Sequence, residues 1–226
     1  MDGKERCIDD EIPFEIPENW AWVRLNSVAK KITDGEHKTP QRVDKFCGYY
    51  LLSARNILDT GIHLSDVDYV NEDEYNKISQ RCNPHRGDIL LSCSGSVGRC
   101  CVINDDNHYV MVRSAAMISP VIMNVKYLIA ALQSLCVQKQ IDERKKQTAQ
   151  ANLFQEAIKN LLIPLPPLQE QRRICDRLEM VCSFITNPAS LILKITSSTL
   201  FLMIPEARNT PSLFKRLGSW GKISII

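Results

Sequence analysis

A proline-rich stretch late in the chain constrains the fold most strongly. Prolines occupy positions 164, 166 and 167, and a proline has no backbone donor, so residues 162–167 cannot be helical. We expect this segment to run extended, without ladder hydrogen bonds. Six of the residues that follow, all apolar except Gln171, are spaced three and four apart, which is the a/d pattern of a coiled coil. They are Leu168, Gln171, Cys175, Leu178, Cys182 and Ile185.

This change of pattern predicts a folded body, an extended exit and a helical arm over residues 167–186. Proline just before the first helical turn is favourable, because its missing donor would have no partner there. The alternative is a loop followed by an ordinary amphipathic helix, since about two and a half heptads fall short of the three or four that indicate a coiled coil.

The composition limits the class of protein. Of the 226 residues 44% are hydrophobic, which suffices for a sizeable core. The longest apolar stretch, residues 190–204, contains Lys194 and is too short for a membrane span. The nine cysteines show no Cys-x-x-Cys pair, and no two histidines are four apart. We therefore expect a reduced, cytoplasmic protein without a metal site or cofactor.

The charge gives no general argument for nucleic-acid binding. The net charge of +2 combines +4 over residues 187–226 with −2 over the rest, so any contact with nucleic acid must come from local clusters. The heptads stop at residue 187. We expect an atypical tail from there on, for which disorder is one expectation and a frameshift or truncation one explanation.

The remaining pattern predicts a polar leader over 1–13 and an α+β or irregular α/β body over 14–166. Strands are expected at 20–25, 49–52, 89–93, 100–103 and 109–112, and helices at 25–32, 71–78, 124–147 and 153–161. Motifs of a P-loop, a hydrolase elbow and a DNA methyltransferase are absent from the sequence. We therefore expect no catalytic activity in this chain.

Four separated stretches carry a resemblance. They are 16–20 followed by the Gly-x-His-x-Thr-Pro of 35–40, then 87–99, 149–153 and 163–171. In this order they resemble the specificity (S) subunits of type I restriction-modification systems. The resemblance implies an α/β target-recognition domain that reads one half of a split double-stranded DNA target. It also implies a helical spacer that docks methyltransferase (M) and restriction (R) subunits, which carry out methylation, ATP hydrolysis and cleavage.

This chain departs from the family pattern in its extent. Family members usually carry two recognition domains and two spacers, whereas one domain and a truncated arm are expected here. Two copies paired as a homodimer through antiparallel arms would favour a symmetric split target. The alternative is a truncated protein that reads no DNA and instead binds or titrates the methyltransferase subunits.

Local chemistry suggests which side chains contact DNA. Small residues and hydroxyls in the loop 94–99 permit close backbone approach, and its arginine can bind phosphate or guanine. Each candidate also has a structural alternative: a hairpin turn for this loop, a solvated surface for 37–42, a strand-end cap for 55–56 and a solvated helix end for 144–146. The candidates are His37, Lys38, Thr39, Arg42, Arg55, Asn56, Ser94, Ser96, Arg99, Lys145 and Lys146. The partner-binding candidates are the six residues of the a/d pattern together with Arg172.

Overall fold

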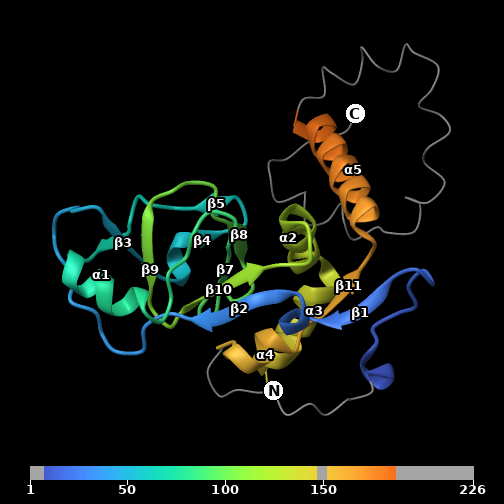
Figure 1. The fold of residues 1–226 in the computed structure, drawn as a ribbon, viewed down its shortest axis with the longest axis horizontal. Helices are drawn as coiled ribbons and strands as arrows, with labels where there is room; N and C mark the ends of the chain where they lie inside the picture. The colour runs from blue at the N-terminus through green and yellow to red at the C-terminus, as the bar shows by residue number, and fades with distance from the viewer. Residues whose placement is uncertain (1–7, 147–151, 187–226) are drawn as a thin grey trace, which may run out of the picture. The chain divides into compact units, whose positions relative to one another are not determined.

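The computed structural model describes residues 8–146 and 152–186 (Figure 1). The chain divides after Asp176 into two compact units. The first unit has a mixed α/β fold, as the sequence predicts, with short sheets and helices that do not alternate regularly. None of the helices in the described ranges is long and apolar enough to cross a membrane.

A four-stranded antiparallel sheet forms the centre of the first unit. Its strands, in spatial order, are β2 (Ala29–Asp34), β10 (Ala115–Pro120), β7 (Ile89–Ser92) and β8 (Cys100–Val102). All four residues of β7 are buried, which explains its continuous apolar run. The helix expected at 25–32 is wrong. Only the 3-10 turn η2 (Leu25–Ser27) forms, and β2 follows because its backbone pairs with β10.

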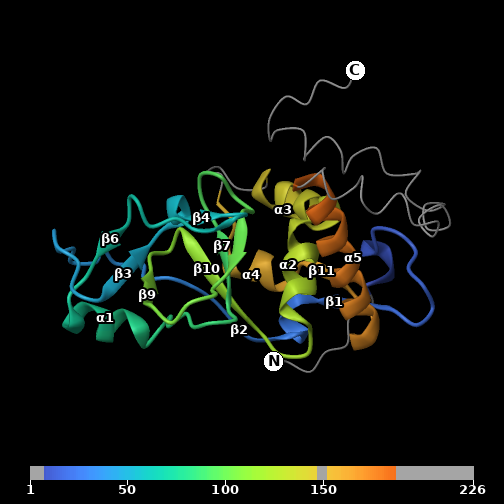
Figure 2. The same ribbon diagram turned by 90° about the horizontal axis from the view of Figure 1, so that it is seen from above.

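A second sheet lies at one end of this unit, beside α1 (Figures 1 and 2). It has the order β6 (Asp68–Tyr69), β3 (Tyr49–Leu52) and β9 (His108–Met111), in which β3 and β9 are parallel. The helix α1 (Glu72–Ser79) is capped by the Asn71 side chain and stacks Tyr75 on Tyr49, with ring centroids 4.5 Å apart. The turn η3 (Ala54–Asn56) and the hairpin of β4 (Ile57–Leu58) and β5 (Gly61–Ile62) follow β3.

Three helices pack at the other end of the first unit (Figure 2). They are α2 (Val125–Gln133), α3 (Leu135–Lys146) and α4 (Gln155–Lys159). The single helix expected at 124–147 is wrong, because the extended backbone of Ser134 (ψ 153°) divides it. Leu128, Leu132 and Ile141 join the main core cluster with residues of the four-stranded sheet.

The proline-rich segment is extended, but it does form a ladder. Strand β11 (Leu162–Leu165) pairs antiparallel with β1 (Ala21–Arg24), and Pro164 lies opposite Trp22. The prediction of no ladder hydrogen bonds is therefore wrong. A two-stranded sheet has two edges, and proline is tolerated where its nitrogen faces away from the partner strand.

Helix α5 (Leu168–Thr186) begins directly after Pro167, as the change of pattern predicts. Its first two turns belong to the core: Gln171 is 1% exposed and Cys175 6%. The Gln171 side chain accepts from the Asn124 backbone N (2.8 Å) and donates to the Pro166 carbonyl (2.8 Å). The prediction that Gln171 and Cys175 bind a partner is therefore wrong, because both pack within this chain.

Four of the other partner-binding candidates are accessible on the surface of α5. Leu168, Arg172, Leu178 and Cys182 are exposed. The side chain of Ile185 and the predicted tail lie outside the described residues. The coiled coil and the predicted domain limits stay predictions.

Candidate nucleic-acid interface

Sheet register brings strand ends from distant parts of the sequence to one place. Ala115 and Ala116, at the start of β10, lie opposite Ser92 and Asp34, so β2 and β7 end where β10 begins. The parallel pair β3 and β9 ends beside them: Val112 N donates to the Leu52 carbonyl (3.0 Å), and Glu36 N, just after β2, donates to the Met111 carbonyl at the end of β9 (2.7 Å).

Four loops leave this place and are hydrogen-bonded to one another. Arg113 N donates to the Glu36 carbonyl (2.9 Å), Ala54 N to Ser114 Oγ (3.1 Å), and Cys93 N to the Ser114 carbonyl (2.8 Å). We call them the four-loop surface, made of residues 35–40, 53–56, 93–99 and 112–114. Because these bonds, two of them between main-chain atoms, fix the loops, the side chains project from a defined frame.

The exposed side chains of this surface are mostly cationic or hydroxyl-bearing. They are His37, Lys38, Thr39, Arg55, Ser96 and Arg113. Within the described ranges, neither the Lys38 ammonium nor the Arg113 guanidinium has a hydrogen-bond or ion-pair partner. Arg113 is not among the residues proposed from sequence. A polar Arg-Ser pair between two apolar runs, 109–112 and 115–118, is the signal that could have identified it.

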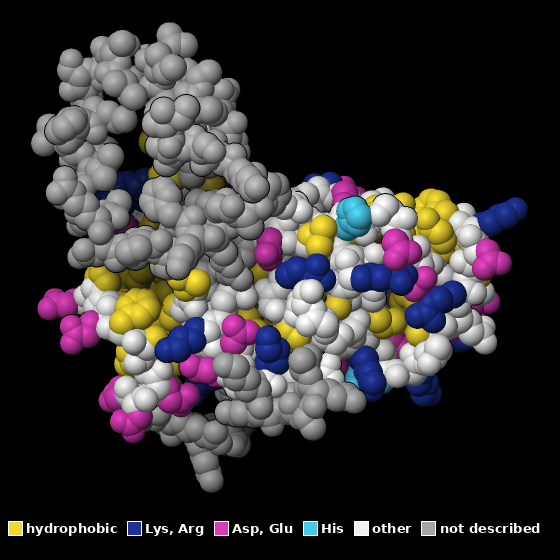
Figure 3. Space-filling view, turned by 180° about the vertical axis from the view of Figure 1, so that it is seen from behind, with side chains coloured by type: hydrophobic (Ala, Val, Ile, Leu, Met, Phe, Trp, Pro, Cys, Tyr) yellow, Lys and Arg dark blue, Asp and Glu magenta, His cyan; other side chains and the backbone are white. Residues whose placement is uncertain are grey.

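Arg42 and Arg55 share one carboxylate beside this surface. Arg42 Nε lies 2.9 Å from Asp68 Oδ2, and Arg55 Nη2 lies 3.1 Å from Asp68 Oδ1. Both arginine side chains stay 44–49% exposed. On the face seen from behind, Lys and Arg side chains are interspersed with Asp and Glu (Figure 3). On such a mixed surface, DNA would be bound by a few local cations and not by a broad basic patch.

Asn56 is not available to read bases. It is 2% exposed. Its Oδ1 accepts from the backbone N (2.9 Å) and Oγ (3.0 Å) of Ser53, and its Nδ2 donates to the carbonyls of His63 (3.1 Å) and Asp66 (3.2 Å). The prediction that Asn56 contacts DNA is therefore wrong, and its side chain caps the turn η3 instead.

Arg99 links two of the loops. Its Nη2 donates to the Ala54 carbonyl (2.9 Å), and its Nε is buried with no hydrogen-bond partner among the described residues. Ser92 Oγ organises the same loop, donating to the Ser96 carbonyl (2.6 Å) and accepting from Arg99 N (3.0 Å). Ser96 is exposed, whereas Ser94 is half-buried and bridges to Asn152.

The basic end of α3 does not join the four-loop surface. Lys145 pairs with Asp142 of its own helix (2.9 Å). Arg144 next to it donates to the Asn160 carbonyl (3.2 Å), so this turn faces the end of α4. The side chain of Lys146 lies outside the described residues.

Asp34 holds two basic side chains at the start of the 35–40 loop. Its Oδ2 lies 2.7 Å from His37 Nε2, and its Oδ1 accepts from Arg81. Burial raises the pKa of the Asp34 carboxyl, but hydrogen bonds and positive charge from Arg81 and His37 outweigh burial and hold the pKa below its ordinary value.

This pKa shift gives the stability a defined pH dependence. A depressed carboxyl pKa contributes stability above the unfolded-state value of about 3.9, and that stability is lost as the pH falls through the folded-state value. We expect Asp34→Asn to unfold at lower urea than the wild type near neutral pH, with the gap closing below about pH 4. Urea midpoints across this range measure it. A gap that is constant with pH would contradict the assignment.

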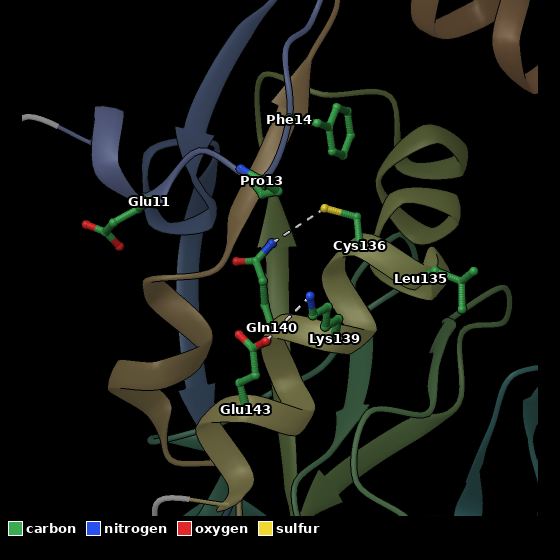
Figure 4. Close-up of a pocket in the computed structure, with 8 residues that line it drawn as sticks. All are labelled: Glu11, Pro13, Phe14, Leu135, Cys136, Lys139, Gln140 and Glu143. Atoms are coloured by element: carbon green, nitrogen blue, oxygen red, sulfur yellow. Dashed lines mark hydrogen bonds and ion pairs between the residues drawn. The ribbon is translucent and has the colours of Figure 1, made fainter.

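One hollow lies elsewhere, on α3. It has a volume of ≈ 440 Å³ and lies between this helix and the segment after η1 (Asp9–Glu11) (Figure 4). Burial raises the pKa of the Cys136 thiol in it, which disfavours a reactive thiolate. Lys139 and Glu143 pair only at 4.0 Å. This hollow offers no arrangement of a nucleophile and a base.

Comparison with known proteins assigns the family. Residues 17–196 match the family model described as the type I restriction modification DNA specificity domain. The chain therefore belongs to this family, and the resemblance seen in its sequence is confirmed. It is 25% identical over 201 residues to the type I restriction enzyme EcoBI specificity subunit of Escherichia coli, a match covering 84% of this chain and 42% of that protein.

Two solved structures share the fold at 21% identity. One, from a study of complex assembly and conformational transition of the type I R-M system, matches with a TM-score of 0.58 over 81% of this chain and 43% of that chain. The HsdS subunit from Thermoanaerobacter tengcongensis matches with a TM-score of 0.51 over 77% of this chain and 40% of that chain. The chain thus spans less than half the length of the relatives it matches.

Proposed function

We propose that this chain reads one half of a split double-stranded DNA target as a non-catalytic specificity subunit of a type I restriction-modification complex. The observation that carries the proposal is the four-loop surface, where loops from four distant segments are joined by two main-chain hydrogen bonds and by the bond from Ala54 N to Ser114 Oγ. Family membership supports it. The proposed location is the cytoplasm, where such a complex meets DNA.

The chemistry of this surface suits both kinds of DNA contact. Lys38, Arg113 and the exposed arginines Arg42 and Arg55 suit phosphates, which set register and orientation. Hydroxyl and imidazole groups of Thr39, Ser96 and His37 can hydrogen-bond to base edges. Neither Asn56 nor the last turn of α3 belongs to the proposed contact set.

The partners of this chain are proposed on the same basis. The exposed residues Leu168, Arg172, Leu178 and Cys182 of α5 form the proposed contact with M subunits, which recruit R subunits for cleavage. A second copy of this chain is the proposed source of the reader for the other half-site. A homodimer with two-fold symmetry would favour a palindromic split target.

The decisive experiment reconstitutes the chain with M subunits and maps DNA methylation. A methylated split motif is the expected result. Partner binding without modification would favour the alternative, a protein that titrates the methyltransferase. The molecular mass of the complex reconstituted from this chain and M subunits shows whether it contains two copies of the chain.

The free cations of the four-loop surface give a residue-level prediction. We expect Lys38→Ala and Arg113→Ala each to weaken binding about 10-fold on all sequences and to lower the salt dependence of log affinity by about 1, as for a lost phosphate contact. Lys77→Ala is the control, because Lys77 lies on α1 and pairs with Glu74. Salt titrations of the reconstituted complex measure the effect. Equal affinities for the three variants would refute the site.

A further inference from the structure

The turn that presents His37 is held by an arginine from a distant part of the sequence. Arg81 follows α1, and its Nε donates to the carbonyls of Asp34 (3.3 Å) and Gly35 (3.1 Å). Its Nη2 donates to the Asp34 carboxylate and lies 3.2 Å from His37 Nε2. One guanidinium therefore contacts both the backbone and the side chains of this turn.

Few other contacts hold the turn beyond Glu36. Main-chain bonds fix Glu36 to the strand ends, and Lys38 N donates locally to Glu36 Oε1 (2.8 Å). Beyond residue 39 the chain is held again, since Pro40 is buried and Gln41 N donates to Glu74 Oε1 (3.2 Å). The direction of residues 37–39 thus depends on the linked group of Arg81, Asp34 and His37.

The contacts made by the Arg81 guanidinium lie outside the hydrophobic core. Its side chain is 42% exposed, whereas Ile78 and Cys82 on either side are fully buried and fix the segment independently. A partly exposed ion pair contributes modestly to global stability, so the loss should be no larger than the one expected for Asp34→Asn. Loss of the Arg81 guanidinium is therefore expected to free the turn while leaving the body folded.

We propose that Arg81 is a positioning residue for target recognition, which acts by aiming His37, Lys38 and Thr39 at DNA. Arginine suits this role because its planar fork can bind a carboxylate and backbone carbonyls at once, which a lysine ammonium cannot do with the same geometry. The role rests on the proposed function of the four-loop surface.

The chain offers a matched control. Arg86 also pairs with a carboxylate through two nitrogens, since its Nε lies 2.8 Å from Asp106 Oδ1 and its Nη2 2.6 Å from Asp106 Oδ2. It also donates to the carbonyl of Asn104. Arg86 precedes β7, whereas the four-loop surface lies at the other end of that strand.

The first test measures binding by the reconstituted complex. We expect Arg81→Met to weaken binding to the DNA motif found by methylation mapping on the order of 10-fold. It should also relax discrimination between bases at a subset of positions in that motif. Arg86→Met should leave both unchanged. In a background with His37, Lys38 and Thr39 all changed to alanine, Arg81→Met should have no further effect, because it acts through them.

The second test uses the purified chain and needs no DNA. Hydrogen exchange should accelerate at residues 37–41 in Arg81→Met and stay unchanged in Arg86→Met, while the thermal midpoints of both variants fall by a similar, small amount because each loses one partly exposed ion pair. The inference would be overturned if hydrogen exchange in Arg81→Met matched the wild type. It would also be overturned if Arg81→Met lowered affinity equally for all DNA sequences and unfolded at a much lower temperature. If the wild-type complex recognises a split motif and the Arg81→Met complex recognises it equally well, the inference is overturned but the proposed function stands. A wild-type complex without sequence preference would overturn both.

Discussion

Gly35→Ala is expected to destabilise the chain by about 3 kcal/mol, at the upper end for overpacking. A Cβ at this position would lie 2.2 Å from the Met111 carbonyl oxygen and 2.5 Å from that of Val112. Both obstacles are backbone atoms of the chain segment that links β9 to β10, so no rotamer change can relieve the clash. The strand ends that carry the four-loop surface would have to separate.

The control for this prediction is Gly48→Ala. Gly48 has a φ of +106°, and a Cβ there would meet nothing within 4 Å, so this substitution tests backbone strain without a clash. Strain of this kind costs about 1–2 kcal/mol. Urea unfolding of the purified variants measures the difference. If Gly35→Ala unfolds at the same urea concentration as Gly48→Ala, the close approach of the strand ends is wrong.

Asn56→Ala is expected to cost about 3 kcal/mol, because it removes a buried side chain that makes four hydrogen bonds to partly buried groups. The Asn56 side chain satisfies Ser53 on one side and the carbonyls of His63 and Asp66 on the other. Alanine can serve neither side, and the side chain is too deeply buried for water to replace it easily. The lost hydrogen bonds hold the turn η3, which contains Arg55. The affinity for target DNA should therefore decrease together with the stability.

Asn76→Ala provides the comparison, since Asn76 is an exposed residue of α1. Alanine is the better helix former, so the change should lie within about 0.5 kcal/mol of the wild type. Thermal and urea unfolding of both variants measure the two effects. An Asn56→Ala chain as stable as Asn76→Ala would show that the buried hydrogen bonds contribute nothing.

Local signals in the sequence predict much of this fold. The strands at 49–52, 89–93, 100–103 and 109–112 follow from apolar runs, and the helix near 71–78 follows from its composition with acidic residues in the first turn; the structure confirms them. The spacing of Val28 and Ile32 imitates a helix, yet pairing with β10 makes the segment a strand. Tertiary pairing overrides local propensity at such positions.

The site was predictable only in part. The 35–40 loop and Arg55 were proposed from sequence and do lie together, whereas Lys145 does not. Nothing local distinguishes a polar residue that faces solvent from one that caps its own turn, as Asn56 does. The meeting of four loops depends on strand order, in which β10 lies between β2 and β7. That order arises from contacts between residues far apart in the chain.

The pairing of β1 with β11 bears on how this body could be engineered. Ala21 lies opposite Leu165, so the body's first and last strands are neighbours. Chain segments whose ends lie close together can be inserted into a host protein with little disturbance. The segment between these strands could therefore be exchanged as a cassette, carrying the target preference proposed for it to a new scaffold without any change in the geometry of the junction.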